Sequence, residues 1–506
     1  WLTAAGVSDD DVTDSTDFRL VAHEPSADWS AHAVVYEIFP DRFARSVPTA
    51  PTGADAPAWA VPCAWGDEVV DHGPLGPRQL FGGDLDGIVA HLDHLQALGV
   101  DTLYLRPVFP AASNHRYDAA TFDEVDELVG GRPALDRLAR AVHDRGMRLV
   151  GDLTTNHCGD THEWFRAARR APDAPERSMF YLDPDGGYAS WYGVPTLPKL
   201  NWGAALVRER MTAVVQRWLP WYDGWRIDVA NMTGRHGAED RTTEVASLLR
   251  RAALAVRPDA ALVAEHMFDA SADLDADGWD GTMNYAGFTR PVWTWLRGPA
   301  GDQVDFIGVP GGIPLRGGVS AMTTMRAFAA GMSWRTLVRS WQVLDSFDCA
   351  RIRTVVGSRE RQVVAAGLQA TLPGVPMICA GSELGLTAAT GEQARTPMPW
   401  DRPAERDEVV HAAYRELFGL RSREPALREG GLRWLHADAD TLVYARETGG
   451  EALVVTARRA PGPAVRLQAR ATWHGVHDAS DLTPDEGHVE LPGDGPSLRI
   501  WRVTER

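Results

Sequence analysis

The chain has 506 residues, a formal net charge of −18 at pH 7 and 44% hydrophobic residues, which is typical of a globular protein with room for more than one domain. The negative charge argues against a nucleic-acid partner and against binding to an anionic membrane surface. No uninterrupted apolar run reaches about 18 residues, so the sequence predicts no transmembrane helix.

Strands and helices alternate along most of the chain. An acidic, irregular lead-in segment covers residues 1–30, and residues 47–80 are predicted to form a long loop. The predicted strands are 34–40, 101–108, 147–153, 224–230, 261–265, 282–285, 343–347 and 375–380. The predicted helices are 87–98, 135–145, 244–255, 333–341, 359–371 and 409–421. Eight strand–helix units predict an α/β fold, a (β/α)8 TIM barrel of parallel strands.

Two segments depart from this alternation. Residues 158–202 follow the third strand, are rich in Pro, Gly and Trp, and are too long for an ordinary connection, so we interpret them as an inserted subdomain. From residue 429 to 506 the helical spacing disappears and short alternating runs follow one another, which predicts an antiparallel β-sandwich domain. The barrel itself is then expected over 31–157 and 203–428.

The four cysteines, Cys63, Cys158, Cys349 and Cys379, are far apart and form no Cys-x-x-Cys pair. This spacing predicts neither a zinc site nor a disulfide framework. Free thiols favour a cytoplasmic location. The chain begins at Trp1 without a signal-peptide pattern, which leaves open whether a segment precedes it.

The fourth predicted strand carries two charges on one face. Arg226 and Asp228 are two residues apart in an apolar run, so their side chains point the same way. Burying either charge alone is costly, and we therefore expect them to hydrogen-bond each other, which would keep Asp228 ionised. The residues alone favour a nucleophile and a structural ion pair about equally.

Acidic residues follow the apolar runs of three predicted strands, at Asp228, Glu265 and Asp348. Catalytic groups of such barrels lie at the C-terminal ends of the strands. Two carboxyl groups about 5 Å apart fit retaining glycoside hydrolysis, in which one attacks and the other transfers a proton. We expect Glu265 to be the proton donor, with its pKa raised by burial and by neighbouring carboxylates.

A cation site is the main alternative use of these acids. His115, His157 and His266 could add nitrogen ligands to such a site. Because no tight His/Asp spacing is present, we predict no metal ligand.

Eight short motifs occur in a fixed order along the chain. They lie at 36–43, 81–87, 113–118, 152–157, 224–228, Glu265, 346–348 and 395–400. Together they resemble glycoside hydrolase family 13, the α-amylase family, over nearly everything from about residue 30 onward. The Leu-Pro-Lys-Leu-Asn motif at 197–201 resembles the neopullulanase, cyclomaltodextrinase and maltogenic amylase branch. The lead-in segment resembles the tail of that branch's N-terminal β-domain.

The resemblance implies roles for individual residues. Asp228 would be the nucleophile, Glu265 the general acid/base, and Asp348 the stabiliser of the distorted sugar in the transition state. Arg226 would orient Asp228. The residues that it assigns to substrate binding are His115, Tyr117, Asp118, His157, Arg226, Phe347 and Arg395, with Asp118 supporting Tyr117. No cofactor is expected to be required, and the calcium-binding aspartate clusters of some relatives are not evident near residues 41–56.

Three positions depart from the family pattern. Phe347 stands where the family usually has His, Gln393 stands where it often has Asp, and Met232 stands where the branch tends to have Glu. Phe347 offers no hydrogen bond to a sugar, so the selectivity of the site is expected to differ. The three acids remain, so the mechanism should survive.

The resemblance implies a retaining α-glucan hydrolase that acts through a covalent glycosyl-enzyme intermediate. The expected substrates are α-1,4 bonds of short or cyclic maltodextrins, with α-1,6 bonds as a further option. A transglycosylase with the same substrates is one alternative, and a catalytically silent glucan-binding barrel is the other. Phe347 and Gln393 give weight to the silent barrel. An oligosaccharide is the expected partner, and the oligomeric state is not predicted.

Overall fold

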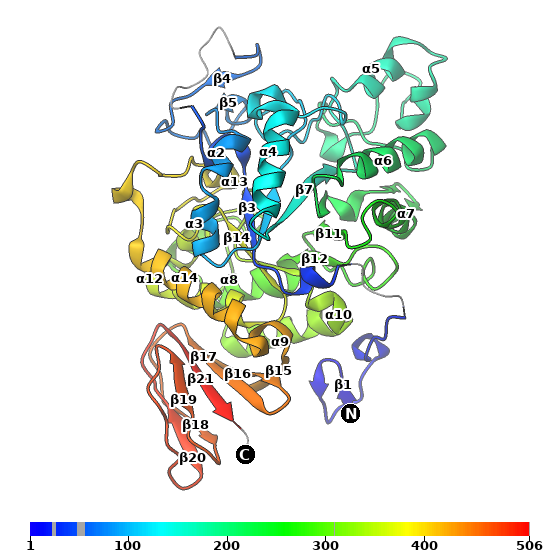
Figure 1. The fold of residues 1–506 in the computed structure, drawn as a ribbon. Coiled ribbons are helices and arrows are strands. Elements are labelled where there is room, and N and C mark those ends of the chain that lie inside the picture. The colour runs from blue at the N-terminus through cyan, green and yellow to red at the C-terminus, as the bar shows by residue number, and fades with distance from the viewer. Residues whose placement is uncertain (23–26, 48–55, 308, 505–506) are drawn as a thin grey trace.

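The computed structural model describes residues 1–22, 27–47, 56–307 and 309–504. The predicted lead-in segment and the predicted long loop each extend over some residues outside this set. Figure 1 shows a barrel surrounded by helices, with a β-sheet region at the C-terminal end of the chain lying against one side. Short strand pairs lie in the N-terminal part of the chain, at Leu2–Thr3 (β1) with Gly6–Val7 (β2), and at Val61–Pro62 (β4) with Gln79–Leu80 (β5).

Eight parallel strands close into a barrel, and the last strand pairs back to the first. In order around the barrel they are β3 (Val35–Ile38), β6 (Thr102–Leu105), β7 (Arg148–Thr154), β8 (Gly224–Asp228), β11 (Ala261–His266), β12 (Gly281–Asn284), β13 (Trp341–Val343) and β14 (Val375–Cys379). Nearly every residue in these strands is buried, because helices cover the outer face and side chains fill the interior. The predicted (β/α)8 fold is confirmed.

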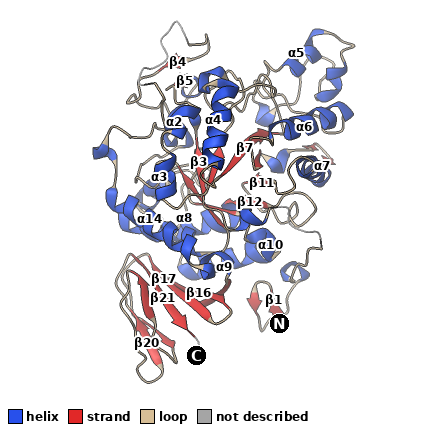
Figure 2. Cartoon of the chain, in the orientation of Figure 1, coloured by secondary structure: helices blue, strands red, loops and turns tan. Residues whose placement is uncertain are grey.

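Helices surround the barrel and are drawn in blue in Figure 2. They are α1 (Pro40–Phe43), α2 (Leu85–Val89), α3 (Leu92–Ala97), α4 (Gly131–His143), α5 (Glu163–Arg170), α6 (Ala205–Trp218), α7 (Thr242–Leu254), α8 (Arg290–Leu296), α9 (Gly318–Ala330), α10 (Trp334–Leu337), α11 (Ile352–Val356), α12 (Arg359–Thr371), α13 (Gly391–Ala394), α14 (Glu408–Arg423) and α15 (Pro425–Glu429). None of the helices in the described part of the chain combines the length and the hydropathy that crossing a bilayer requires.

The prediction of one continuous helix over 87–98 is wrong. Two short helices, α2 and α3, take its place, and the chain leaves helical geometry at His91. The imidazole Nδ1 of His91 lies 2.9 Å from the carbonyl oxygen of Gly87, and its ring packs 4.2 Å from the ring of Trp400. A side chain that bonds to the backbone of the preceding turn competes with helix continuation, which explains the break.

The prediction for 333–347 is also wrong in detail. The helix predicted over 333–341 is only the four-residue α10, and the following barrel strand is β13 at Trp341–Val343 instead of 343–347. Trp334, Leu337, Val338 and Trp341 have helical spacing, but Trp341 pairs with Met283 of β12 and Val375 of β14. Tertiary strand pairing therefore overrides the local pattern.

An excursion from the barrel separates β7 from α6. It contains α5, and isolated bridges hold its return path, among them His157 with Lys199 and Ser190 with Pro198. A short hairpin at Arg235–His236 (β9) and Glu239–Asp240 (β10) follows β8 on the same end of the barrel. These segments stand over the C-terminal ends of β7 and β8.

The C-terminal region is an antiparallel sheet of five strands in the order β15, β16, β17, β21, β19, with a separate pair β18–β20. The strands are β15 (Gly431–Ala437), β16 (Thr441–Thr448), β17 (Glu451–Arg458), β18 (Val465–Gln468), β19 (His474–His477), β20 (His488–Leu491) and β21 (Ser497–Thr504). In β16, Leu442 and Tyr444 pack with the barrel core while Val443 and Ala445 join a second core with the β18–β20 pair. The alternation of side chains along a strand thus lets one sheet serve two cores.

Gly367 of α12 marks where this sheet meets the barrel. A methyl group on Gly367 would lie 2.1 Å from Cδ2 of Leu498 in β21, so any larger residue would require the Leu498 side chain to move. The hydroxyl groups of Thr371 and Tyr444 also lie 2.6 Å apart across the same contact.

Candidate active site

A cavity of about 770 Å³ opens at the C-terminal ends of the barrel strands. Eight of the ten residues predicted for the site line it, and these are His115, Tyr117, Asp118, His157, Asp228, Glu265, Asp348 and Arg395. Arg226 lies beneath them in β8, and the side chain of Phe347 is packed elsewhere. Asp228 and Glu265 come from adjacent strands, β8 and β11, whereas Asp348 lies five residues beyond the end of β13.

The guanidinium of Arg226 joins three carboxylates. Its Nη1 donates to Asp228 Oδ1 at 2.8 Å and to Asp152 Oδ1 at 3.0 Å, and its Nη2 lies 2.6 Å from Glu265 Oε1. Asp152 of β7 and Arg226 of β8 are register partners in the parallel ladder, which places their side chains together. The predicted hydrogen bond between Arg226 and Asp228 is therefore present, but Arg226 also serves two further acids.

Two tyrosines fix Asp152 from the other side. The hydroxyl groups of Tyr104 and Tyr117 donate to Asp152 Oδ2 at 2.5 Å and 2.7 Å. Both oxygens of Asp152 thus accept hydrogen bonds, so this buried carboxylate anchors Arg226 and Tyr117 instead of facing the cavity.

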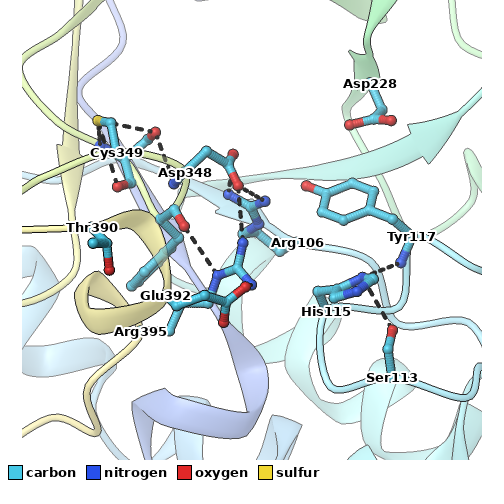
Figure 3. A network of polar contacts seen from close by, with 12 residues as sticks. Arg106, Ser113, His115, Tyr117, Asp228, Asp348, Cys349, Thr390, Glu392 and Arg395 are labelled. Atoms are coloured by element: carbon cyan, nitrogen blue, oxygen red, sulfur yellow. Dashed lines mark hydrogen bonds and ion pairs between the residues drawn. The ribbon is translucent and has the colours of Figure 1, made fainter. Parts of the chain in front are cut away.

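Asp348 is held by two guanidinium groups, as Figure 3 shows. Arg106, which follows β6, donates from Nη1 to Oδ2 at 2.9 Å and from Nη2 to Oδ1 at 3.0 Å. Arg395 Nη2 adds a contact to Oδ1 at 3.2 Å, and Arg395 Nη1 is itself paired with Glu392 at 2.6 Å. This bidentate clamp fixes the orientation of the Asp348 carboxylate at the cavity wall.

The environments of the three acids divide them into two classes. Burial raises the pKa of both Asp228 and Glu265; Arg226 opposes that shift, and neighbouring carboxylates add to it. Burial also acts on Asp348, but Arg106 and Arg395 outweigh it and hold the pKa of Asp348 below its usual range. Asp348 is therefore ionised, whereas the other two carboxyls compete for one cation.

The raised pKa of Glu265 agrees with the prediction, but the raised pKa of Asp228 does not. We expected Arg226 to keep Asp228 ionised, yet one guanidinium faces Asp152, Asp228 and Glu265 together. A single positive charge cannot compensate three buried negative charges, so the Asp228–Glu265 pair favours a state that holds one proton.

Two neutral histidines line the cavity. The backbone N–H of Tyr117 donates to His115 Nδ1 at 3.2 Å, and the Asn156 amide group lies 3.1 Å from His157 Nδ1. With Nδ1 as the acceptor, Nε2 carries the hydrogen in both rings. Burial lowers the pKa of His115 and, together with the charge of Lys199, lowers the pKa of His157 to about 3. Both imidazoles are thus uncharged donors.

The side chain of Asp118 contacts Tyr117 only indirectly, through Ser113 and His115. We expected it to support Tyr117, but its carboxylate accepts from the backbone N–H of Ala112 at 3.1 Å and from the hydroxyl group of Ser113. Ser113 Oγ in turn lies 3.1 Å from His115 Nδ1. Asp118 therefore stabilises the loop that carries His115.

Phe347 and Gln393 both point away from the cavity. Phe347 is buried, its ring packs edge-on against Phe39 with centroids 5.6 Å apart, and only its backbone oxygen reaches the site, where it accepts from Arg395 Nε at 3.0 Å. Gln393 Nε2 donates to Asp71 Oδ2 at 2.8 Å. The predicted substrate contact of Phe347 is thus absent among the cavity-lining residues of the described chain.

Lys199 lies behind the cavity wall that contains Met232. Its ammonium group contacts Asn156 Oδ1 and donates to the backbone oxygen of Met232 at 2.9 Å. Burial lowers the pKa of Lys199 to about 8. The ammonium group is therefore the cation that Asn156 faces.

Arg106 contacts Asp348, and Asp152 contacts Arg226. The sequence analysis gave no role to Arg106 or Asp152. Arg106 follows a buried apolar strand and precedes Pro107, and Asp152 lies inside a buried strand. The signal that drew attention to Arg226, a lone charge in an apolar run, is present at both positions and identifies them equally well.

Comparisons with known proteins match the chain to one family of enzymes. The family described as alpha amylase, catalytic domain, matches residues 37–434. A cyclomaltodextrinase of Geobacillus thermopakistaniensis (strain MAS1) is 32% identical over 464 residues, which cover 88% of this chain and 72% of that protein. Neopullulanase 2 of Thermoactinomyces vulgaris is 31% identical over 432 residues, which cover 83% of this chain and 67% of that protein.

Solved structures match over nearly the whole chain. The ligand-free cyclic α-maltosyl-(1→6)-maltose hydrolase from Arthrobacter globiformis has a TM-score of 0.77 and 28% identity, covering 95% of this chain and all of that one. The type III pullulan hydrolase from Thermococcus kodakarensis has a TM-score of 0.79 and 26% identity, covering 94% of this chain and 82% of that one. The Arthrobacter hydrolase has also been solved in complex with cyclic α-maltosyl-(1→6)-maltose.

Proposed function

Since this chain belongs to the α-amylase family of glycoside hydrolases, we propose that it is a retaining α-glucan hydrolase. Its substrates are short or cyclic maltodextrins, in which it cleaves α-1,4 bonds and, as a second activity, α-1,6 bonds. The observation that carries the proposal is the guanidinium of Arg226, which contacts Asp228 and Glu265 at once, 2.8 Å and 2.6 Å away, under the cavity. Two carboxyls tied together in this way suit a nucleophile and a proton donor.

In the first step Asp228 attacks the anomeric carbon of the sugar while Glu265 protonates the departing glycosidic oxygen. The bond between that carbon and oxygen breaks, and an ester of Asp228 with the sugar forms. This step needs one ionised and one protonated carboxyl. The raised pKa values of Asp228 and Glu265, which favour one shared proton, support this charge state.

In the second step Glu265, now ionised, removes a proton from water, and the oxygen of that water attacks the same carbon. The ester bond to Asp228 breaks, and the configuration of the sugar is retained after two inversions. Asp348 stays negative because Arg106 and Arg395 lower its pKa, which suits the positive charge that develops on the sugar ring. The Nε2–H group of His115 is available to bind a sugar hydroxyl, whereas Nε2 of His157 is buried and has no hydrogen-bond partner among the described residues.

The substrate class rests on the relatives and on the cavity. The names of the relatives refer to cyclomaltodextrins, pullulan and cyclic maltosyl-maltose, and the cavity offers both charged groups and the apolar faces of Trp191, Tyr192 and Phe268. Such apolar faces suit the faces of glucose rings. We also propose that hydrolysis needs no bound metal, in keeping with the Lys199 ammonium group at Asn156. A cytoplasmic location, in keeping with four buried, unpaired cysteines, is likewise a proposal.

The test is product analysis with maltotriose, β-cyclodextrin, pullulan, panose and starch, followed by ¹H NMR of the first anomer that is released. The α-anomer from maltotriose or β-cyclodextrin is the expected product. Mass spectrometry after reaction with 5-fluoro-α-glucosyl fluoride should add one sugar to the peptide that contains Asp228. Release of the β-anomer would overturn the retaining mechanism.

Two other outcomes identify the alternatives. Longer oligosaccharides that form at high maltotriose concentration would make transfer the main reaction. Binding of maltotriose by calorimetry without any turnover would show a silent barrel.

A further inference from the structure

A further buried carboxyl group lies directly behind the clamp on Asp348. Glu37 of β3 is fully buried, and its Oε1 accepts from Arg106 Nη1 at 2.8 Å. The same Nη1 donates to Asp348 Oδ2 at 2.9 Å, so one nitrogen bridges a carboxyl inside the barrel and a carboxylate at the cavity. Arg106 lines the cavity and Glu37 does not.

The second oxygen of Glu37 is unusual. Oε2 is buried and has no hydrogen-bond partner among the described residues. A buried carboxylate with one unsatisfied oxygen is costly, and the cost falls when the group takes up a proton. Register explains the position: Glu37 pairs with Tyr104 on one side and with Cys379 on the other, so its side chain enters the barrel interior.

We propose that Glu37 is a positioning residue for hydrolysis, whose protonation state sets how firmly Arg106 holds Asp348 and how much negative charge lies under the catalytic acids. The proposal rests on the function proposed above and assigns a role to a residue that touches neither substrate nor reacting atoms. When Glu37 is protonated, its carbonyl oxygen still accepts from Arg106, and the charge of Arg106 is directed mainly to Asp348. When Glu37 is ionised, Arg106 is shared between two negative groups.

The surroundings of Glu37 support a titration in this range. Burial raises the pKa of Glu37 to about 7; Arg106 opposes the shift and Asp348 adds to it. The charged or titratable groups that face Glu37 are Arg106 after β6, Arg226 on β8, Tyr285 after β12, Asp348 after β13 and Cys379 on β14. Of these, Tyr285 and Cys379 have pKa values raised far above neutral by burial and stay uncharged.

The kinetic test compares Glu37→Gln with Glu37→Leu. At pH 5.5, where Glu37 is protonated, Glu37→Gln should keep kcat/KM within about 3-fold of wild type, because the amide oxygen accepts the same hydrogen bond. Above pH 7 the variant lacks the negative charge of ionised Glu37. Removing a negative charge from beneath the catalytic acids lowers the pKa of a general acid, so the alkaline limb of the pH–rate profile should move to lower pH by about half a unit. Glu37→Leu removes the acceptor and should lower kcat/KM about 10-fold or more at every pH.

A second measurement needs no substrate. The pKa of Glu37 is raised in the folded state, so the stability that it contributes is complete below its unfolded pKa and is lost as pH rises through about 7. The Tm of Glu37→Gln should therefore rise relative to wild type between pH 5 and pH 8.

Glu383 provides a matched control. It is equally buried, accepts from the hydroxyl group of Tyr36 at 2.8 Å and from the backbone N–H of Gly381, and lies outside the cavity. Although burial acts on it, hydrogen bonds and the charge of His94 lower the pKa of Glu383. The Tm of Glu383→Gln should therefore be lower than that of wild type, by a margin that grows as pH rises from 3 to 6. The alkaline limb of its pH–rate profile should not shift.

The proposal requires both results for Glu37→Gln. Superimposable pH–rate profiles for Glu37→Gln and wild type would overturn it, and so would a Tm difference that does not change with pH. If the wild type hydrolyses none of the glucans, the proposed function fails instead. In that case the Tm series and the dissociation constant of maltotriose at pH 5.5 and 8.5 decide on Glu37 separately.

Discussion

Arg226 Nη2 lies 2.6 Å from Glu265 Oε1, although the two residues belong to different strands. Because Nη1 of the same guanidinium contacts Asp228, the two candidate catalytic carboxyls cannot move independently. A planar group with a fixed fork of donors is suited to this bridging, whereas a single ammonium group is not.

Arg226→Lys should therefore impair turnover more than it impairs folding. We expect kcat to fall about 100-fold or more, because a lysine can satisfy only one of the acids at a time. The control is Arg235→Lys, since Arg235 also forms a bidentate pair, with Asp273 at 2.7 Å and 3.0 Å, but lies outside the active-site cavity. Equal losses of kcat in both variants would contradict a special role for Arg226.

Asp228→Asn should abolish turnover and also change how stability depends on pH. Burial raises the pKa of Asp228, so the stability contributed by this group is complete below its unfolded pKa and is lost as pH rises through the folded value. The Tm of Asp228→Asn should consequently exceed that of wild type at pH 8, by a margin that shrinks toward pH 4. Differential scanning calorimetry across this range checks the sign.

Asp273→Asn is the counterpart of that experiment. Although burial acts on it, hydrogen bonds from His266 and Arg235 lower the pKa of Asp273, so its stabilising contribution is lost as pH falls. A loss of Tm in Asp273→Asn that is larger at pH 7 than at pH 3 is expected. The same pH trend in both variants would show that their environments do not distinguish Asp228 from Asp273.

Tyr192 combines an exposed ring with a strained backbone at the rim of the cavity. Its side chain is 72% exposed and its φ is +46°, a conformation that favours glycine. Tyr192→Gly should raise the free energy of unfolding by about 0.5 kcal/mol, the strain relief being partly offset by the entropy of glycine in the unfolded chain. The same change should raise KM for β-cyclodextrin, whereas Tyr192→Phe should match wild type.

Phe347→His tests whether the family's usual histidine would improve this site. The ring of Phe347 packs against Phe39 and near the guanidinium of Arg351, whose carbon lies 5.7 Å from the ring centroid. An imidazole placed there would be buried without a hydrogen-bond partner, so we expect the free energy of unfolding to fall by about 1–2 kcal/mol. We also expect no gain in kcat/KM for maltotriose. A gain would mean that the ring can turn into the cavity.

The sequence predicts features that local pattern alone determines. Helix α12 covers the residues predicted for it, 359–371, and the side chain of Ser358 caps its start by accepting from the backbone N–H of Arg361. The pairing of Arg226 with Asp228 also follows from strand geometry. The sharing of Arg226 among three acids does not follow, because it depends on which strands are neighbours in the closed barrel.

The remaining errors have the same origin. Trp341 lies at the end of a helical pattern but enters the barrel. Pairing with both β12 and β14 stabilises this position more than one additional turn of helix would. The orientation of Phe347 depends on Phe39, which is more than 300 positions away in the chain. Contacts between such distant segments are not encoded in local spacing.

The close contact between Gly367 and Leu498 affects how the chain can be made. Helix α12 belongs to the barrel, yet the surface that it presents at Gly367 is completed only by β21, a strand placed centrally between β17 and β19. During synthesis, β21 emerges from the ribosome long after α12, so this side of the barrel is covered late. Until then, the surface of α12 around Gly367 lacks the Leu498 side chain that packs against it.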